Sequence, residues 1–358
     1  MSLASDGSHL ALAWYGTTPG ARESIHLRYL DGKGGPAGPD VRLTDGARQA
    51  YEPSLQLLDG DAIVAWYEKD AAGATQAYVG RFSSSGTRRW QTNLSPPHAR
   101  GRNPVVRTGA SGIHVAWLQQ RTEEAETLVM HGRLDPDGSW KDVPRDAGRA
   151  DPGTWNLNAA LDPSGTFHLV YDARGRTDAR EIQLISIRGA QVQHTQLSAD
   201  DGFASQFPDL AVDHGRIALT WFDERDGNHE VYLYVGAFPD PGTAIDDKAL
   251  RITRTAGDSI GAYVAWHDNV VGLAWCDDTT GEYTIFAQQF DERGTPLNRP
   301  KPLTDGRLQA LVPSIVPWQQ GFAVAWNERL ALEDGSRHSR TVSSGARVRL
   351  VPLAGNRH

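Results

Sequence analysis

Seven short apolar segments, each ending in an aromatic residue, recur along the chain at nearly constant spacing. They are Leu10–Trp14, Ala62–Trp66, Ile113–Trp117, Phe167–Tyr171, Ile217–Trp221, Val271–Trp275 and Phe322–Trp326. Their terminal aromatic residues, called the anchors below, lie 52, 51, 54, 50, 54 and 51 residues apart. A repeat of this length indicates a fold in which neighbouring units bury one another's apolar faces.

Each repeat also carries the pattern of four short strands. In the second repeat, Pro53–Leu58 and Ala62–Trp66 predict the first two strands, and Gln76–Phe82 alternates as a third strand does. Val41–Thr44 and Pro302–Thr304 indicate a fourth strand in the first and sixth repeats. Four antiparallel strands repeated around an axis are the blade of a β-propeller.

The sequence therefore predicts an all-β fold, a seven-bladed β-propeller of four-stranded antiparallel blades. We expect a single domain over residues 1–358, with blades at about 1–51, 52–102, 103–157, 158–206, 207–261, 262–311 and 312–358. In the last repeat, Ser339–Gly345 is predicted as the third strand and Arg347–Leu350 as the outermost one, so the ring should close without strand exchange. The anchors should pack between neighbouring blades.

Composition and charge exclude several classes of function. The 37 glycines and 20 prolines suit many short strands joined by turns. A net charge of −8 gives no basic field for nucleic acid, so that partner is not expected. No nucleotide-binding fingerprint or His/Cys cluster is present, so we expect no cofactor and no metal, and the lone Cys276 excludes an internal disulfide. No apolar run is long enough for a transmembrane segment.

Two families of loops should meet at one face of the ring. The positions two residues after the anchors include four acidic residues, Glu68, Asp223, Asp277 and Glu328. They predict either an electronegative funnel for a cation, an amine or a hydroxyl-rich sugar, or ion pairs with nearby basic residues that only stabilise the loops.

The second family comprises the loops that lead into the innermost strands. They contribute Tyr51, Glu52, His98, Arg100, Arg102, Asn103, Trp155, Asn156, Gln206, Phe207, Asp258 and Tyr263. Aromatic rings beside arginine, amide and acidic side chains are typical of carbohydrate recognition. We therefore predict a ligand-binding rim formed by Tyr51, Glu52, Glu68, His98, Arg102, Asn103, Trp155, Asn156, Gln206, Asp223, Asp277 and Glu328.

The sequence assigns no catalytic residues and does not decide whether the chain is an enzyme. Any two of the rim carboxylates would provide the pair that glycoside hydrolysis requires. A lyase would need a base beside an arginine, for which Tyr51, His98 and Arg102 are the candidates. Two histidines, His114 and His168, occupy equivalent positions three residues before an anchor. They are either a proton-shuttle or metal pair, or neutral side chains hydrogen-bonded to the backbone.

The blade that runs from Ile217–Asp223 through Val231–Tyr234 to the turn Asp240–Gly242 resembles the blades of the sialidase-like, or BNR-type, propeller superfamily. This resemblance implies a glycan-related role and an extracytoplasmic location, periplasmic or secreted, with a signal segment removed ahead of Ser2. It does not imply sialidase activity. Asp135–Trp140 lacks the spacing of the sialidase Asp-box, no Arg-Ile-Pro segment occurs, and sialidases have six blades.

We therefore expect an extracytoplasmic propeller that binds a glycan or another small polar ligand at the rim, with glycan processing left open. The first alternative is a scaffold for a protein partner without a small-molecule ligand. The second alternative is a polysaccharide lyase or glycoside hydrolase.

Overall fold

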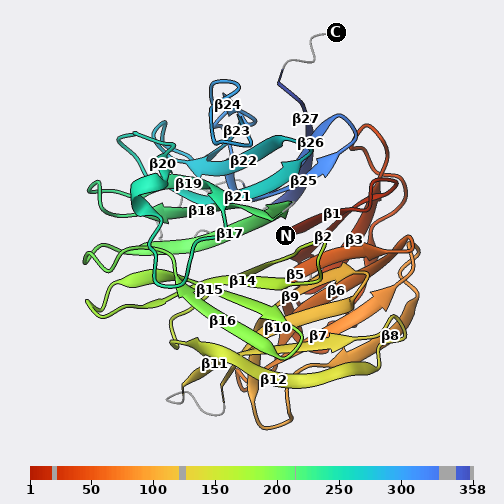
Figure 1. Cartoon of the computed structure of the whole chain (residues 1–358). Coiled ribbons are helices and arrows are strands. Elements are labelled where there is room, and N and C mark those ends of the chain that lie inside the picture. The colour runs from red at the N-terminus through yellow and green to blue at the C-terminus, as the bar shows by residue number, and fades with distance from the viewer. Residues whose placement is uncertain (18–21, 121–125, 214, 330–343, 355–358) are drawn as a thin grey trace.

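The computed structural model describes residues 1–17, 22–120, 126–213, 215–329 and 344–354, which form seven antiparallel sheets arranged in a ring (Figure 1). The predicted seven-bladed propeller is confirmed. The single helical turn in the described residues is the 3₁₀ segment η1 (Asp246–Lys248). The described part of the chain contains no helix long and apolar enough to cross a membrane.

Within each blade, the strands follow one another outward from the axis in chain order. Their bounds are β1 (Ser2–Ser5), β2 (Leu10–Gly16), β3 (Ser24–Leu30) and β4 (Val41–Arg42) in blade 1; β5 (Gln49–Leu58), β6 (Asp61–Lys69), β7 (Thr75–Phe82) and β8 (Arg88–Asn93) in blade 2; β9 (Arg100–Gly109), β10 (Gly112–Gln120), β11 (Thr127–Leu134) and β12 (Trp140–Ala150) in blade 3; β13 (Leu157–Leu161), β14 (Phe167–Arg174), β15 (Arg180–Arg188) and β16 (Gln191–Gln196) in blade 4; β17 (Ser205–Asp213), β18 (Arg216–Asp223), β19 (Glu230–Ala237) and β20 (Leu250–Arg251) in blade 5; β21 (Ser259–His267), β22 (Val270–Asp277), β23 (Thr284–Asp291) and β24 (Lys301–Pro302) in blade 6; and β25 (Gln309–Trp318), β26 (Gly321–Arg329) and β27 (Ser344–Pro352) in blade 7.

Blade 7 differs from the prediction, because its described residues form three strands and not four. Arg347–Leu350, predicted as the outermost strand, belongs to β27 and pairs directly with β26, with Arg347 opposite Trp326. Ala346, Val348 and Leu350 pack against apolar residues of blade 1, and this contact accounts for the third-strand position. The predicted third strand at 339–345 lies mostly outside the described residues.

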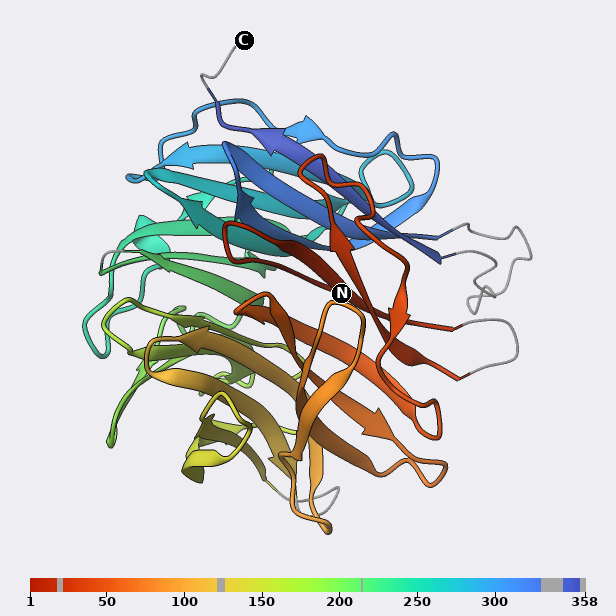
Figure 2. The same cartoon turned by 90° about the vertical axis from the view of Figure 1, so that its right-hand side faces the viewer.

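The ring closes without strand exchange in the described residues, as predicted. Blade 7 lies directly beside blade 1, and Figure 2 shows the first blade between the second and the last. The backbone N–H of Leu3 in β1 donates to Ser314 Oγ in β25 at 3.0 Å. Equivalent bonds run from Leu55 N to Ser2 Oγ (3.0 Å) and from Val106 N to Ser54 Oγ (3.1 Å). The boundary between the first and last blades is therefore built like the others.

The apolar core lies between the blades. Six anchors are at most 4% exposed, whereas Trp14 is only partly buried. Several anchors stack on the residue opposite them in the third strand, such as Trp66 on Tyr78, with ring centroids 5.6 Å apart. The expected role of the anchors in packing is confirmed for the six buried ones.

We predict that Trp117→Ala will lower the free energy of unfolding by about 3–5 kcal/mol, because it opens a cavity between blades 2 and 3. Trp155→Ala is the matched control and should cost less than about 1 kcal/mol, because Trp155 is 57% exposed. Urea unfolding followed by circular dichroism measures both. Equal losses would contradict the packing role of the anchor.

Candidate functional site

The innermost strands of all seven blades enclose a cavity of about 800 Å³ along the axis of the ring. Its lining divides into two levels. The mouth consists of Tyr15, Glu52, Asn103, Trp155, Asn156, Phe207, Phe222, Val312 and Asn327. The channel interior includes Ser2, Gln56, Arg107, Asn158, Asp209, Tyr263 and Ser314.

The backbone is strained at the mouth in a repeated way. Glu52, Asn103, Phe207 and Val312 have φ angles of 50°, 49°, 51° and 52°, and each directly precedes a proline. In each of these four innermost strands, the pairing register shifts at that residue. Such a shift is a β-bulge. Left-handed backbone costs about 1–3 kcal/mol at a non-glycine residue, and bulges often redirect side chains beside functional sites. The repeated strain is therefore a reason to look for function at this level.

The bulges also account for a difference in strand bounds. The innermost strands of blades 2, 3, 5, 6 and 7 begin two or three residues before the predicted boundaries, for example at Gln49 and not at 52. The sequence pattern placed the strand start at Pro53. The bulge allows pairing to continue before the proline, so that Gln49 still lies opposite Lys69.

Asn103 links three parts of the mouth. Its Nδ2 donates to a carboxylate oxygen of Glu52 and, at 2.6 Å, to the backbone carbonyl of Trp155. Because both neighbours are acceptors, the amide must present its NH₂ group to them. Asn103 Oδ1 then has no donor among the residues that the structure describes, although Asn103 is only 7% exposed. Burial raises the pKa of the neighbouring Glu52.

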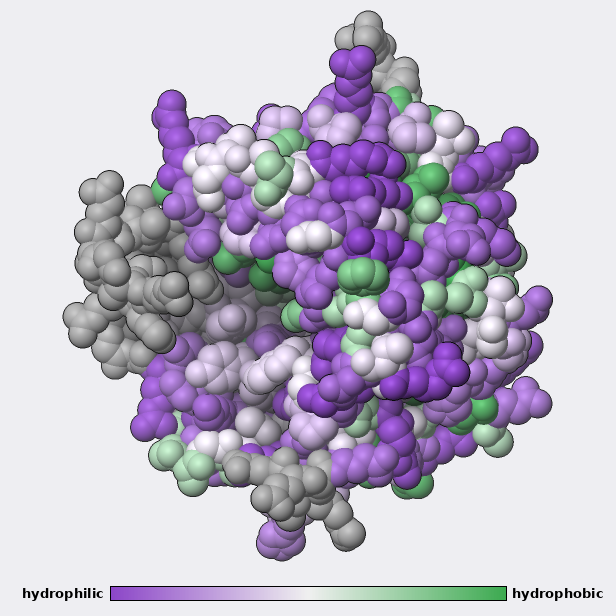
Figure 3. Space-filling model, turned by 90° about the vertical axis from the view of Figure 1, so that its left-hand side faces the viewer, coloured by the Kyte–Doolittle hydropathy of each residue, from purple (hydrophilic) through white to green (hydrophobic). Residues whose placement is uncertain are grey.

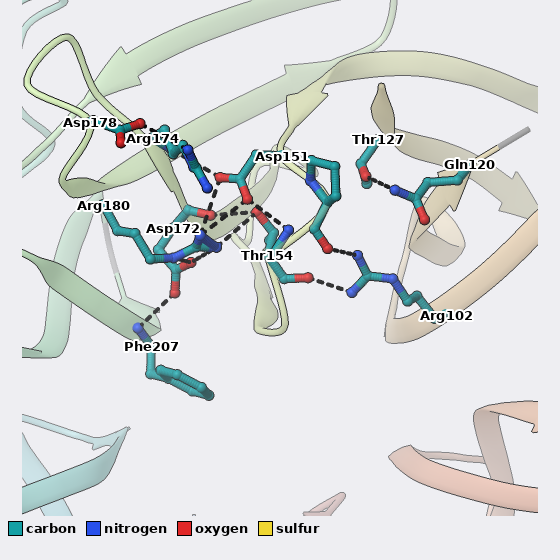
Figure 4. Close-up of polar contacts among 12 residues, drawn as sticks. Arg102, Gln120, Thr127, Asp151, Thr154, Asp172, Arg174, Asp178, Arg180 and Phe207 are labelled. Carbon is teal, nitrogen blue, oxygen red and sulfur yellow. Dashed lines mark hydrogen bonds and ion pairs between the residues drawn. The ribbon is translucent and has the colours of Figure 1, made fainter. Parts of the chain in front are cut away.

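Trp155 forms an exposed aromatic surface beside this group. Its ring is 57% exposed and lies against the Arg102 guanidinium, whose carbon is 5.2 Å from the ring centroid. Arg102 also donates to the carbonyl oxygens of Thr154 and, at 2.9 Å, of Pro152. Figure 4 shows Arg102 reaching across from β9 to this loop. Arg102 is thus used to hold the loop that carries Trp155.

A second arginine fixes the same loop from blade 4. Arg180 binds Asp172 at 2.7 Å and Asp151 at 3.1 Å, as Figure 4 shows. Thr154 Oγ1 donates to the backbone carbonyl of Asp172 at 2.7 Å. The other oxygen of the Asp172 carboxylate accepts the backbone N–H of Phe207 at 3.0 Å, which ties the bulge of blade 5 to the same network.

The four predicted acidic residues have internal partners. The indole N–H groups of Trp66, Trp221 and Trp326 donate to Glu68, Asp223 and Glu328 at 3.0, 3.1 and 3.0 Å. Asp277 accepts from Ser259 Oγ at 2.7 Å. Three of the four carboxylates are thus placed to satisfy a buried indole.

Two of these carboxylates also form ion pairs. Asp223, which is fully buried, binds Arg225 at 2.6 Å, and Glu328 binds Arg347 at 2.9 Å. Arg347 comes from the next strand of the sheet. A ligand-binding role for the four acidic residues stays a prediction.

The remaining predicted rim residues are divided between the cavity and its surroundings. Glu52, Asn103, Trp155 and Asn156 line the cavity. Tyr51 packs between Tyr15 and Tyr67, and its ring centroid is 5.5 Å from the ring centroid of each. His98 is exposed, and Gln206 Nε2 donates to Glu224 at 3.2 Å.

Sequence reasoning missed Tyr15, Phe222 and Asn327, which line the mouth. Each directly follows an anchor, so the informative position is one residue after the anchor and not two. It also missed Arg107 and Asp209 in the channel interior. No motif marks these two, and only their alignment with the innermost strands would have indicated them.

The two predicted histidines do not pair with each other. His114 contacts His131 at 3.2 Å and Ser111 at 2.9 Å, and His168 contacts Ser186 at 2.9 Å. Burial lowers the pKa of His114 to about 4 and that of His131 to about 3. His114 and His131 are therefore neutral at pH 7. This agrees with the second alternative for His114, but its partners are side chains and not backbone groups.

We predict that acid will destabilise the protein through these imidazoles. Their pKa values are lower in the folded state, so their contribution is fully present above about pH 6.5 and is lost as the pH falls toward 4. Below pH 6.5 each imidazole should cost up to about 1.4 kcal/mol per pH unit. His131→Gln should show a shallower loss than the wild type in denaturant unfolding at pH 7 and pH 4.5. Identical slopes would contradict the assignment.

We also predict that Arg180→Gln will loosen the loop at 151–156, because it removes the charge that joins Asp151 to Asp172. Amide hydrogen exchange in this loop should accelerate about tenfold, which is about 1.4 kcal/mol of local stability. Arg174→Gln is the matched control, since the one ion pair of the Arg174 side chain with the described residues is to the exposed Asp178. Equal exchange in the two variants would show that Arg180 does not hold the loop.

Comparisons with known proteins identify the fold. No family model matches the sequence, and no curated protein matches it. Among solved structures, a puromycin-hydrolysing peptidase from Mycobacterium tuberculosis is 13% identical, with a TM-score of 0.58, over 92% of this chain and 48% of its own. The present chain thus spans about half the length of that peptidase.

Two other solved structures match nearly the whole chain. A protein of unknown function from Dyadobacter fermentans is 12% identical over 98% of this chain and 94% of its own, with a TM-score of 0.56. The endosialidase of phage phi92 is 8% identical over 98% of this chain and 66% of its own, also with a TM-score of 0.56. These likenesses show the propeller fold that the blade pattern predicted.

Proposed function

We propose that the mouth of the channel binds a carbohydrate. The observation that carries the proposal is the exposed Trp155 ring, which lies against Arg102 at the mouth beside the polar residues Glu52 and Asn103. An aromatic face provides an apolar surface for the C–H face of a sugar. Glu52 and Asn103, which line the same cavity, carry carboxylate and amide groups of the kind that hydrogen-bond to hydroxyl groups.

The surrounding contacts support a preformed site. Arg102, Arg180 and Asp172 fix the loop of Trp155, so little conformational entropy is lost when a ligand binds. Tyr15, Phe207 and Phe222 add further rings to the mouth. The endosialidase is named for its action on a glycan, and its shared fold agrees with a glycan-related role. An extracytoplasmic location is part of the same proposal and rests on the resemblance of the blades.

We predict that Trp155→Ala will weaken binding to glycans by at least about tenfold, or about 1.4 kcal/mol. A glycan array identifies the ligand, and isothermal titration then measures its affinity. Phe203→Ala is the matched control, because Phe203 is 48% exposed but does not line the cavity. Its affinity should equal that of the wild type.

Two results would contradict carbohydrate binding at the mouth. One is an array without any bound glycan. The other is a glycan that the Trp155→Ala, Arg102→Ala double variant binds as tightly as the wild type. Either result would favour the alternative of a protein-interaction scaffold.

Glycan processing is a second proposal, favoured by one observation. The carboxyl group of Glu52 lies at the mouth, and burial raises its pKa, as general acid catalysis requires. Asp209 is the other carboxylate that lines the cavity. Turnover of aryl glycosides that is lost in Glu52→Gln would support hydrolysis, since Gln keeps an acceptor for Asn103. Absence of turnover would leave a binding protein.

A further inference from the structure

Arg107 lies inside the channel, well below the mouth. It follows Asn103 by four residues on β9, which corresponds to about 13 Å along a strand. Both residues line the same cavity. A ligand group that reaches Arg107 must therefore enter the ring beyond the bulges.

The Arg107 guanidinium has few partners. Its Nη1 donates to the carbonyl oxygen of Val106 at 2.7 Å, and it forms no ion pair with the described residues. By contrast, Arg180 and Arg225 at the rim bind Asp172 and Asp223 at 2.7 and 2.6 Å. Burial lowers the pKa of Arg107, which reflects the cost of holding this charge inside the ring.

The nearest compensating charge is Asp209 on β17. Its Oδ2 accepts the backbone N–H of Val264 at 2.9 Å, so the carboxylate is held by blade 6 and does not reach the guanidinium. Burial also raises the pKa of Asp209 to about 6. Tyr263, on the adjacent β21, also lines the cavity, at the level of Asp209 and nearer the mouth than Arg107, because it pairs with Ala274 as Asp209 pairs with Thr220. Its hydroxyl makes no hydrogen bond to the residues that the structure describes.

We propose that the channel interior binds a carboxylate group, held by the guanidinium of Arg107. A planar guanidinium matches a carboxylate through two parallel hydrogen bonds. The cavity of about 800 Å³ has room for a small organic acid or for the acidic end of a longer ligand. The site is separate from the mouth and does not depend on carbohydrate binding there.

Isothermal titration with acetate, D-glucuronate and D-glucose tests the proposal. We expect saturable binding of acetate or D-glucuronate with a dissociation constant below about 10 mM, and none for D-glucose, which lacks a carboxylate. Binding of acetate indicates a small free acid as ligand. Binding of D-glucuronate alone indicates the carboxylate of an acidic sugar.

Arg107→Gln should weaken this binding at least tenfold without harming the fold. Gln56 occupies the equivalent position in blade 2, and its Nε2 donates to the carbonyl oxygen of Leu55 as Arg107 does to Val106. A glutamine at position 107 can therefore keep the same backbone contact. Arg188→Gln is the matched control. Arg188 lies at the exposed end of β15, so this variant removes one positive charge away from the channel and should leave the affinity unchanged.

Asp209→Asn distinguishes a carboxylate from other ligands. Asparagine still offers an oxygen to the backbone N–H of Val264 but removes a negative charge from the channel. The affinity for an anion should therefore rise at least about threefold. The proposal is overturned if neither acid binds below about 10 mM. It is equally overturned if Arg107→Gln binds like the wild type, or if Asp209→Asn weakens binding, as a cationic or dipolar ligand would require.

Discussion

The structure depends on the burial of one large ring per blade against the neighbouring blade. A buried indole supplies much apolar surface, but its N–H must find an acceptor. The chain solves this with a polar side chain two residues later, as Trp66 and Glu68, Trp117 and Gln119, and Trp221 and Asp223 show. The acidic residues that the sequence places around one face are therefore part of the packing.

A second constraint acts where the innermost strands begin. Residues with positive φ at the same level of several blades turn their side chains toward one opening. Since a strand that continued regularly would place these residues in the sheet, the bulge is what separates a mouth from the blades. Asn103 shows the result, because one side chain at a bulge contacts both the preceding blade and the following loop.

The sequence was sufficient for the fold and for part of the site. The period of the anchors gave the number of blades, because each blade must repeat the same burial. Trp155 and Asn103 were predicted to lie at the opening from their place before an innermost strand. The network around Arg102, Thr154 and Arg180 could not be predicted, since it joins residues of different blades whose relative positions follow only from closure of the ring.

Other differences concern the place of a residue or a segment within its blade. Tyr15, Phe222 and Asn327 line the cavity although each follows an anchor, because each lies near the end of a second strand, beside the mouth. The sequence pattern also placed Arg347–Leu350, which belongs to β27, as the fourth strand of blade 7 and not as the third. A short alternating segment fits either the third or the fourth place in a blade, and its contacts with blade 1 decide between them.

The boundary between blades 7 and 1 has a thermodynamic consequence. No strand crosses it in the described residues, and the contact of Leu3 with Ser314 lies at the wall of the cavity itself. A molecule that filled the channel as far as Leu3 and Ser314 would contact blades 1 and 7 together and hold this boundary closed. Occupancy and ring opening would then be linked, so that the protein resists thermal opening more strongly as its ligand concentration rises.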